Sequence, residues 1–114
     1  AGLTVDAAVQ LNGRVIQPVV DLAAYRILQE ALTNVARHAG PVHVTVTVEA
    51  AEHSLDLSVE NDAGPAPRKV ASAGVGLLGI RERVSLLGGR LDTGFTAGGG
   101  FRLAARLPLD GRAP

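Results

Sequence analysis

The chain of 114 residues has the length of one ordinary domain, so we expect a single domain over residues 1–114. Lysine and arginine number 11, as do aspartate and glutamate, and neither sign forms a block, which argues against nucleic acid as a partner. There is no cysteine for disulfides or thiolate metal ligands, and no apolar run long enough to span a membrane, so we expect no direct membrane contact. The sequence also has no methionine, which suggests an internal or C-terminal part of a longer protein.

The first part of the chain has the pattern of a strand followed by a long helix. Apolar residues alternate with polar or small ones from Leu3 to Val9, which predicts a half-buried strand, and Asn12-Gly13 predicts a turn. From Pro18 onward the apolar residues take helical spacing, until Ala39-Gly40-Pro41 ends the pattern.

The middle of the chain predicts a hairpin and then a loop. Valines alternate from Val42 to Val48, and a second alternating run extends from Leu55 to Val59, with a short polar connection between them. The stretch from Asp62 to Ala73 is rich in proline, glycine and alanine and has no usable periodicity, so we expect a mobile loop there.

A second helix and two closing strands complete the prediction. The helix is expected from about Leu77 to Leu87, with Leu78, Val84 and Leu87 buried, and to end at Gly88-Gly89. Strands are expected at 90–95 and 101–107. This order predicts an α/β fold with a mixed five-stranded sheet and helices on one face.

Three polar residues of the long helix, Glu30, Asn34 and His38, are spaced four apart and therefore form one stripe that rises roughly 12 Å. A carboxylate, a carboxamide and an imidazole in a row could coordinate a hard cation such as magnesium, activate a hydroxyl or water, and contact phosphate oxygens. A solvated helix face has the same spacing, and spacing alone does not separate the two interpretations.

The glycine segment Gly74-Val75-Gly76-Leu77-Leu78-Gly79 has the spacing of a dinucleotide-binding fingerprint. That fingerprint directly follows a buried strand, whereas Pro65 and Pro67 precede this segment, and no Walker lysine follows it. What remains is a glycine-opened helix start, whose backbone N–H groups could bind phosphate oxygens; an ordinary flexible loop is the alternative.

The order of these segments resembles the GHKL ATPase superfamily, and most closely its bacterial sensor histidine kinases of the nitrate-sensor and membrane-fluidity-sensor type. The resemblance covers nearly the whole chain. YRILQEALTNVARHA, at 25–39, resembles the N box, with its E-x3-N-x3-H core. GVGLLGIRERVSLLGG, at 74–89, resembles the G2 segment and the helix after it, and GGGFRLAARLP, at 98–108, resembles the closing hairpin.

The resemblance implies a Bergerat-type two-layer α/β sandwich that binds ATP and Mg2+ and transfers the γ-phosphoryl group to a histidine. Asn34 would be the metal ligand. Glu30 would act near the reacting phosphoryl group as a base or as an orienter, while Arg37 and His38 would lie near the phosphates. Four residues would wrap the phosphates with backbone N–H groups, under a lid formed by 62–73: Gly74, Val75, Gly76 and Leu77.

One position departs from the family pattern. The G1 box normally has an aspartate that accepts a hydrogen bond from the adenine amino group, and the matching stretch here is Val59-Glu60-Asn61-Asp62-Ala63-Gly64. Strand parity places residue 61 on the face of Leu55, Leu57 and Val59, so we assign the adenine contact to Asn61. Its amide oxygen can still accept from adenine but lacks a carboxylate's charge, which predicts weaker adenine binding or looser discrimination between bases. Phe101 also stands where the closing hairpin often has a threonine.

The partners implied by the resemblance are ATP, the kinase's own dimerisation domain with its phosphoacceptor histidine, and a response regulator reached through that domain. His43 and His53 fall in a strand and in a hairpin connection, so neither suits the phosphoacceptor role. We expect the isolated domain to be monomeric and cytoplasmic. Two alternatives stay open: an anti-sigma-factor-like serine kinase or switch protein of the same superfamily, and a degenerate nucleotide-binding module.

Overall fold

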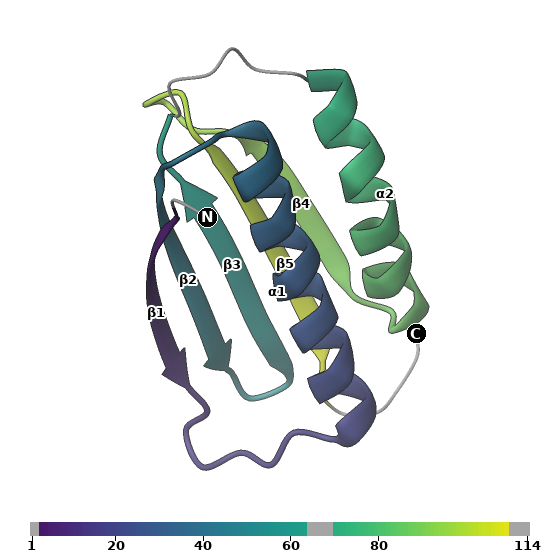
Figure 1. Cartoon of the computed structure of the whole chain (residues 1–114). Helices are drawn as coiled ribbons and strands as arrows, with labels where there is room; N and C mark the ends of the chain where they lie inside the picture. The colour runs from purple at the N-terminus through teal and green to yellow at the C-terminus, as the bar shows by residue number, and fades with distance from the viewer. Residues whose placement is uncertain (1–2, 64–69, 110–114) are drawn as a thin grey trace.

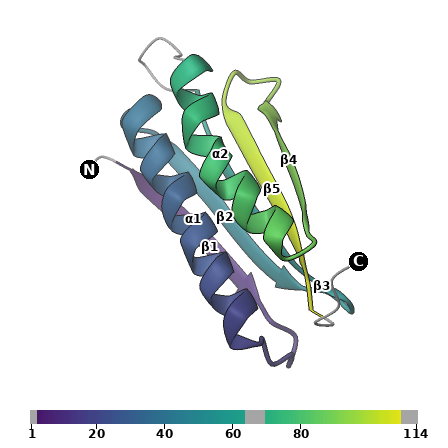
Figure 2. The ribbon, with the colours of Figure 1, turned by 90° about the vertical axis from the view of Figure 1, so that its right-hand side faces the viewer.

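The computed structural model describes residues 3–63 and 70–109, and within 70–76 it describes the backbone alone. Five strands form one sheet, and two helices pack on one of its faces (Figure 1, Figure 2). The elements follow the order β1 (Thr4–Gln10), α1 (Pro18–His38), β2 (His43–Ala50), β3 (Ser54–Asn61), α2 (Val70–Leu86), β4 (Arg90–Phe95) and β5 (Phe101–Pro108). The predicted α/β fold with a mixed sheet is therefore confirmed.

The sheet has the strand order β1-β2-β3-β5-β4. β1 pairs with β2 in parallel, and every other neighbouring pair is antiparallel. A parallel pair needs a long crossover, which α1 provides, whereas β2–β3 and β4–β5 are hairpins with short turns.

In the part of the chain that the structure describes, no helix is both long enough and apolar enough to cross a membrane.

The core lies between the helices and the inner face of the sheet. α1 contributes a buried row of apolar residues at helical spacing, and β2, β3 and β5 contribute alternate residues because strand side chains point to opposite faces. The largest fully buried side chains among the described residues are Ile27, Val44, Leu57, Ile80, Val84 and Leu107.

Local chemistry explains where α1 begins and ends. Pro18 occupies the first helical turn, where its missing N–H is not needed, and Asp21 lies in the same turn, where a negative charge is favoured by the helix dipole. Arg37 and His38 lie in the last turn, and Gly40 then takes a φ of 79°, which the absence of a Cβ permits. The predicted bounds of this helix are confirmed.

Three predictions about the elements are wrong. α2 begins at Val70, so residues 70–73 belong to a helix rather than to the predicted loop. The alanines there favour helix, and the helix continues through Gly74 and Gly76, which weaken a helix without ending it as a proline would. Leu78 is exposed, since it lies on the side of α2 opposite Ile80. β1 is exposed along its whole length, although its alternation predicted a half-buried strand. Residues 64–69 of the predicted loop lie outside the described residues.

Candidate functional site

The predicted polar stripe lies along the flank of α1 that borders the core. Glu30, Asn34 and His38 are all half-buried, whereas Gln29 and Thr33 on the open side of the same helix are exposed. A stripe on a fully solvated face would share the exposure of those two neighbours. The half-burial of all three residues therefore favours a polar stripe that borders the core over the interpretation of the stripe as a solvated helix face.

Arg83 of α2 contacts the first residue of this stripe. Its Nε and Nη2 atoms lie 3.2 Å and 3.1 Å from the same carboxylate oxygen, Oε1 of Glu30. The other oxygen, Oε2, lies 3.0 Å from the position that a Cβ on Gly79 would occupy. Both oxygens of the Glu30 carboxylate therefore face α2, one against a guanidinium and the other against a glycine.

The contact between Glu30 and Gly79 also shows which turns of α1 and α2 lie side by side. α1 and α2 run in opposite directions (Figure 1), so one turn onward from Glu30 leads to Asn34 while one turn back from Gly79 leads to the backbone of Val75. The predicted phosphate-binding segment, residues 74–77, therefore lies alongside the stripe, at the end of the molecule where α1 ends and α2 begins. The topology thus brings together two predicted parts that are far apart in the sequence.

The conformation of this segment differs from the predicted one. Residues 74–77 lie within α2, behind its first turn, rather than in an open loop at its start. Within an α-helix these N–H groups bond to the carbonyl oxygen four residues earlier. In this structure they are used by the helix, and the wrapping of a phosphate by Gly74, Val75, Gly76 and Leu77 would require the start of α2 to unwind.

The parity argument for residue 61 is confirmed. Asn61 is buried, with 7% of its surface exposed, whereas Asp62 is exposed. The side-chain amide Nδ2 of Asn61 donates a hydrogen bond of 2.8 Å to the carbonyl oxygen of Asp62. Asn61 thus ends β3 on the helix-covered face of the sheet, with Phe101 of β5 opposite it in register.

The aromatic residue at 101 has a clear packing role. Its ring packs against that of Phe95 with the ring centres 5.3 Å apart and the planes at 74°, an edge-to-face arrangement that is favourable for aromatic pairs. These two residues are paired at the end of the β4–β5 hairpin. Phe101 therefore contributes to closing the hairpin, where a threonine hydroxyl was expected from the family pattern.

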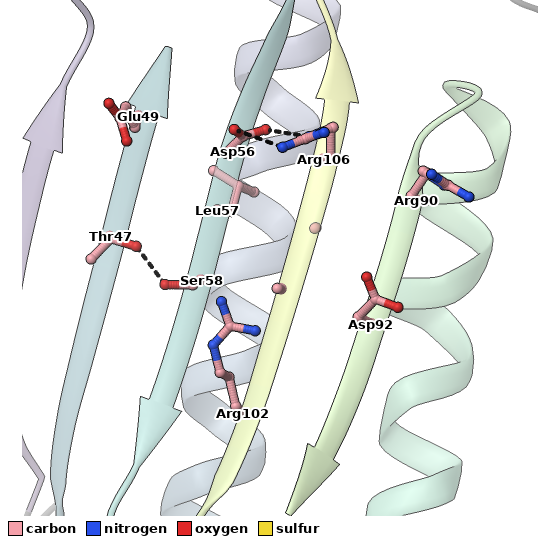
Figure 3. Close-up of a pocket in the computed structure, with 11 residues that line it drawn as sticks. Thr47, Glu49, Asp56, Leu57, Ser58, Arg90, Asp92, Arg102 and Arg106 are labelled. Atoms are coloured by element: carbon pink, nitrogen blue, oxygen red, sulfur yellow. Dashed lines mark hydrogen bonds and ion pairs between the residues drawn. The ribbon is translucent and has the colours of Figure 1, made fainter. Parts of the chain in front are cut away.

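The opposite face of the sheet carries a separate, open pocket that contains none of the predicted site residues (Figure 3). Asp56 of β3 accepts hydrogen bonds from Arg106 of β5, with the closest approach 3.0 Å from Nε to Oδ1. Thr47 and Ser58 form a hydroxyl pair across β2 and β3. These interactions are typical cross-strand pairs on a solvated sheet face.

Comparison with known proteins identifies the class of protein to which this chain belongs. Residues 20–111 match the family model described as histidine kinase-, DNA gyrase B- and HSP90-like ATPases. The catalytic domain of the histidine kinase ThkA superimposes with a TM-score of 0.75 at 16% identity, covering 97% of this chain and 82% of that one. Full-length ShkA, solved in complex with AMPPNP, gives a TM-score of 0.73 at 22% identity and covers 99% of this chain and 27% of that one. The fold is that of a histidine kinase catalytic domain.

Curated relatives narrow the class. UhpB, a signal transduction histidine-protein kinase/phosphatase of Salmonella typhimurium, is 38% identical over 74% of this chain and 16% of its own length. The sensor histidine kinase LnrJ of Bacillus subtilis is 32% identical over 91% of this chain and 27% of its own length. The chain belongs to this ATPase family, in its sensor histidine kinase branch, and spans less than a third of the length of these relatives.

Two residues of the site were not predicted from the sequence. Gly79 and Arg83 are four residues apart, so they share a face of α2, and that face meets Glu30. The sequence pattern places Gly79 in a glycine motif and assigns no role to Arg83. The i, i+4 spacing of Gly79 and Arg83 indicates a shared helix face, but it does not indicate that this face meets Glu30.

Proposed function

We propose that the domain binds Mg-ATP and donates the γ-phosphoryl group to a histidine on a separate dimerisation domain in two-component signalling. The observation that carries this proposal is the half-buried stripe of Glu30, Asn34 and His38 lying beside α2, in a chain that belongs to the ATPase family. Phosphoryl transfer needs mainly positioning and charge neutralisation, and a rigid helix edge suits the first of these.

The magnesium ion would be held by Asn34. Its carboxamide oxygen is a hard ligand, the residue is half-buried, and it lies one turn from Glu30 on the same edge. Magnesium commonly uses one or two protein oxygens and takes its remaining ligands from phosphates and water, so a single asparagine fits that pattern. When bound, the ion would neutralise charge on the ATP phosphates.

The other predicted site residues would have the following roles in binding ATP and in phosphoryl transfer. Glu30 would orient or deprotonate the attacking group, and His38 and the exposed Arg37 would contact the phosphates at the end of α1. The segment 74–77 would bind phosphates through its backbone once the start of α2 opens. Asn61, buried at the end of β3, would accept a hydrogen bond from adenine.

The partners belong to the same proposal. The acceptor would be a dimerisation domain with a phosphoacceptor histidine, and the phosphoryl group would pass from there to a response regulator. We expect this chain alone to be monomeric and to work in the cytoplasm, where ATP is supplied. The anti-sigma-factor-like and degenerate alternatives receive no support from these curated relatives, which are sensor histidine kinases.

Calorimetry of ATP binding, with and without magnesium, tests the assignment of the stripe. We expect Asn34→Ala to weaken binding in magnesium by at least about tenfold, as typically follows disturbance of a metal site, and to have little effect in its absence. Gln29→Ala is the matched control, because Gln29 is an exposed amide on the same helix. Equal affinity of the wild-type chain and Asn34→Ala in both conditions would show that the assignment is wrong.

Transfer from labelled ATP to a separately expressed dimerisation domain tests the activity itself. We expect label on the acceptor histidine only when both proteins are present. Binding of ATP without any transfer of label would instead favour the degenerate nucleotide-binding module.

A further inference from the structure

The carboxylate of Glu30 is held by α2 in an unsymmetrical way. Two donors of the Arg83 guanidinium converge on Oε1, at 3.2 Å and 3.1 Å, and no hydrogen bond from Arg83 to Oε2 accompanies them. Oε2 instead faces the Cα of Gly79, where a Cβ would stand only 3.0 Å away. The arrangement fixes the direction of the carboxylate, and among the residues that the structure describes no guanidinium binds Oε2.

Stability gives little reason for this arrangement. The side chains of Arg83 and Glu30 are 38% and 34% exposed, and ion pairs at such partly solvated positions contribute little to folding. A glycine within a helix weakens it relative to alanine. Gly79 nevertheless lies well inside α2, where Oε2 of the Glu30 carboxylate approaches the helix.

We propose that Arg83 is a positioning residue for phosphoryl transfer, and that Gly79 provides the space in which it holds Glu30. This inference rests on the proposed function, since it concerns the same site. Arg83 binds Oε1, and Oε2 is the atom that accepts a hydrogen bond from the attacking group. Arginine suits this role because its planar guanidinium presents two donors in a fixed geometry.

The geometry makes Arg83 act through Glu30, which a double-mutant cycle can detect. Transfer rates are measured for the wild-type chain, Arg83→Gln, Glu30→Gln and the double variant, with labelled ATP and a histidine-bearing dimerisation domain. We expect Arg83→Gln to lower the transfer rate on the order of tenfold to a hundredfold, as misplacement of a catalytic group does. In the Glu30→Gln background the same change should have almost no further effect.

Further measurements distinguish a positioning role of Arg83 from a purely structural one. ATP affinity, measured by calorimetry, should change less than about threefold in Arg83→Gln, because the interaction serves the reaction rather than binding. Arg83→Lys should recover part of the rate, since it keeps one charged donor. Arg81→Gln is the control, being an exposed arginine on the same helix, and should transfer at the wild-type rate.

The nuclear magnetic resonance signal of the Arg83 Nε–H group reports on the contact without any transfer. We expect this signal in the wild-type chain, its loss or displacement in Glu30→Gln, and its persistence when the chain is saturated with Mg-ATP. Disappearance of the signal on ATP binding would mean that Arg83 sequesters Glu30 in the free protein, which overturns the positioning role.

The inference and the proposed function fail in different ways. If the wild-type chain neither binds ATP nor transfers label, the proposed function is wrong. If the wild-type chain transfers label and Arg83→Gln transfers at the same rate, the inference alone is wrong. Additive losses in the double variant would likewise reject action through Glu30.

Discussion

Gly100 lies so close to Asn61 that a Cβ added to the glycine would overlap the backbone carbonyl oxygen of the asparagine. Since that atom belongs to the backbone of β3, it cannot move aside as a flexible side chain would. The approach fixes the turn of the β4–β5 hairpin against the end of β3, at Asn61, which is the residue proposed to bind adenine.

Gly100→Ala should therefore destabilise the domain by about 2 kcal/mol, a cost typical of an overpacked site. Gly98→Ala is the control, because a Cβ there meets nothing within 4 Å. We expect it to stay within about 0.5 kcal/mol of the wild type. Chemical denaturation measures both variants, and equal stability of the two would contradict the close approach.

Asn61→Asp should have opposite effects on ATP binding and on stability. A carboxylate is a stronger acceptor for the adenine amino group, so ATP affinity should rise. Without ATP, the aspartate cannot donate the hydrogen bond of 2.8 Å to the carbonyl oxygen of Asp62, so the free protein should lose about 1–3 kcal/mol.

Calorimetry and denaturation, measured on the same samples, separate these two effects. Asp62→Asn is the control, because residue 62 is exposed and lies just beyond the end of β3. An ATP affinity of Asn61→Asp that is unchanged or lower would reject the adenine contact.

Val5 and Val44 test how far the core extends under α1. The two residues are partners across β1 and β2, yet 44% of Val5 is exposed and Val44 is fully buried. Val44→Ala should cost about 2 kcal/mol through lost burial and the cavity left behind. Val5→Ala should stay within about 0.5 kcal/mol, as expected at a surface position. Urea denaturation distinguishes them, and similar losses would mean that β1 is covered in solution.

The ion pair between Asp56 and Arg106, on the open face of the sheet, should contribute little to the stability of the domain. Asp56→Asn removes the carboxylate that receives Arg106, whose side chain is 65% exposed. We expect a loss below about 1 kcal/mol, and a smaller one at high salt, because solvent and ions screen such pairs. Thermal unfolding at two salt concentrations checks this, and a large loss that is independent of salt would contradict it.

Much of the fold could be predicted because proline and glycine mark the ends of helices and the alternation of apolar and polar residues marks the strands. Pro18 and Gly40 mark the ends of α1, and the run at Arg90–Phe95 is a strand with the bounds that its sequence predicted. Strand parity also placed Asn61 on the buried face. Each of these features depends on residues that are neighbours in the sequence.

The rest depended on contacts between distant segments. Alternation along β1 shows which residues share a face, and it does not show whether a helix covers that face, so the exposure of Val5 and Val9 was missed. The contact of Glu30 with Arg83 joins residues 53 positions apart. Nothing local to either residue indicates the other. The proposed ligand-binding roles remain predictions that need a nucleotide to test them.

The placement of β1 has a consequence for how the domain opens. This strand pairs with β2 alone, in parallel, and the family model begins at residue 20, after β1 has ended. A strand with one neighbour and little buried surface separates from the sheet at low cost. We expect the backbone amides of β1 to exchange with deuterium long before those of β3, so that detachment of this edge precedes global unfolding and leaves the antiparallel sheet and both helices assembled.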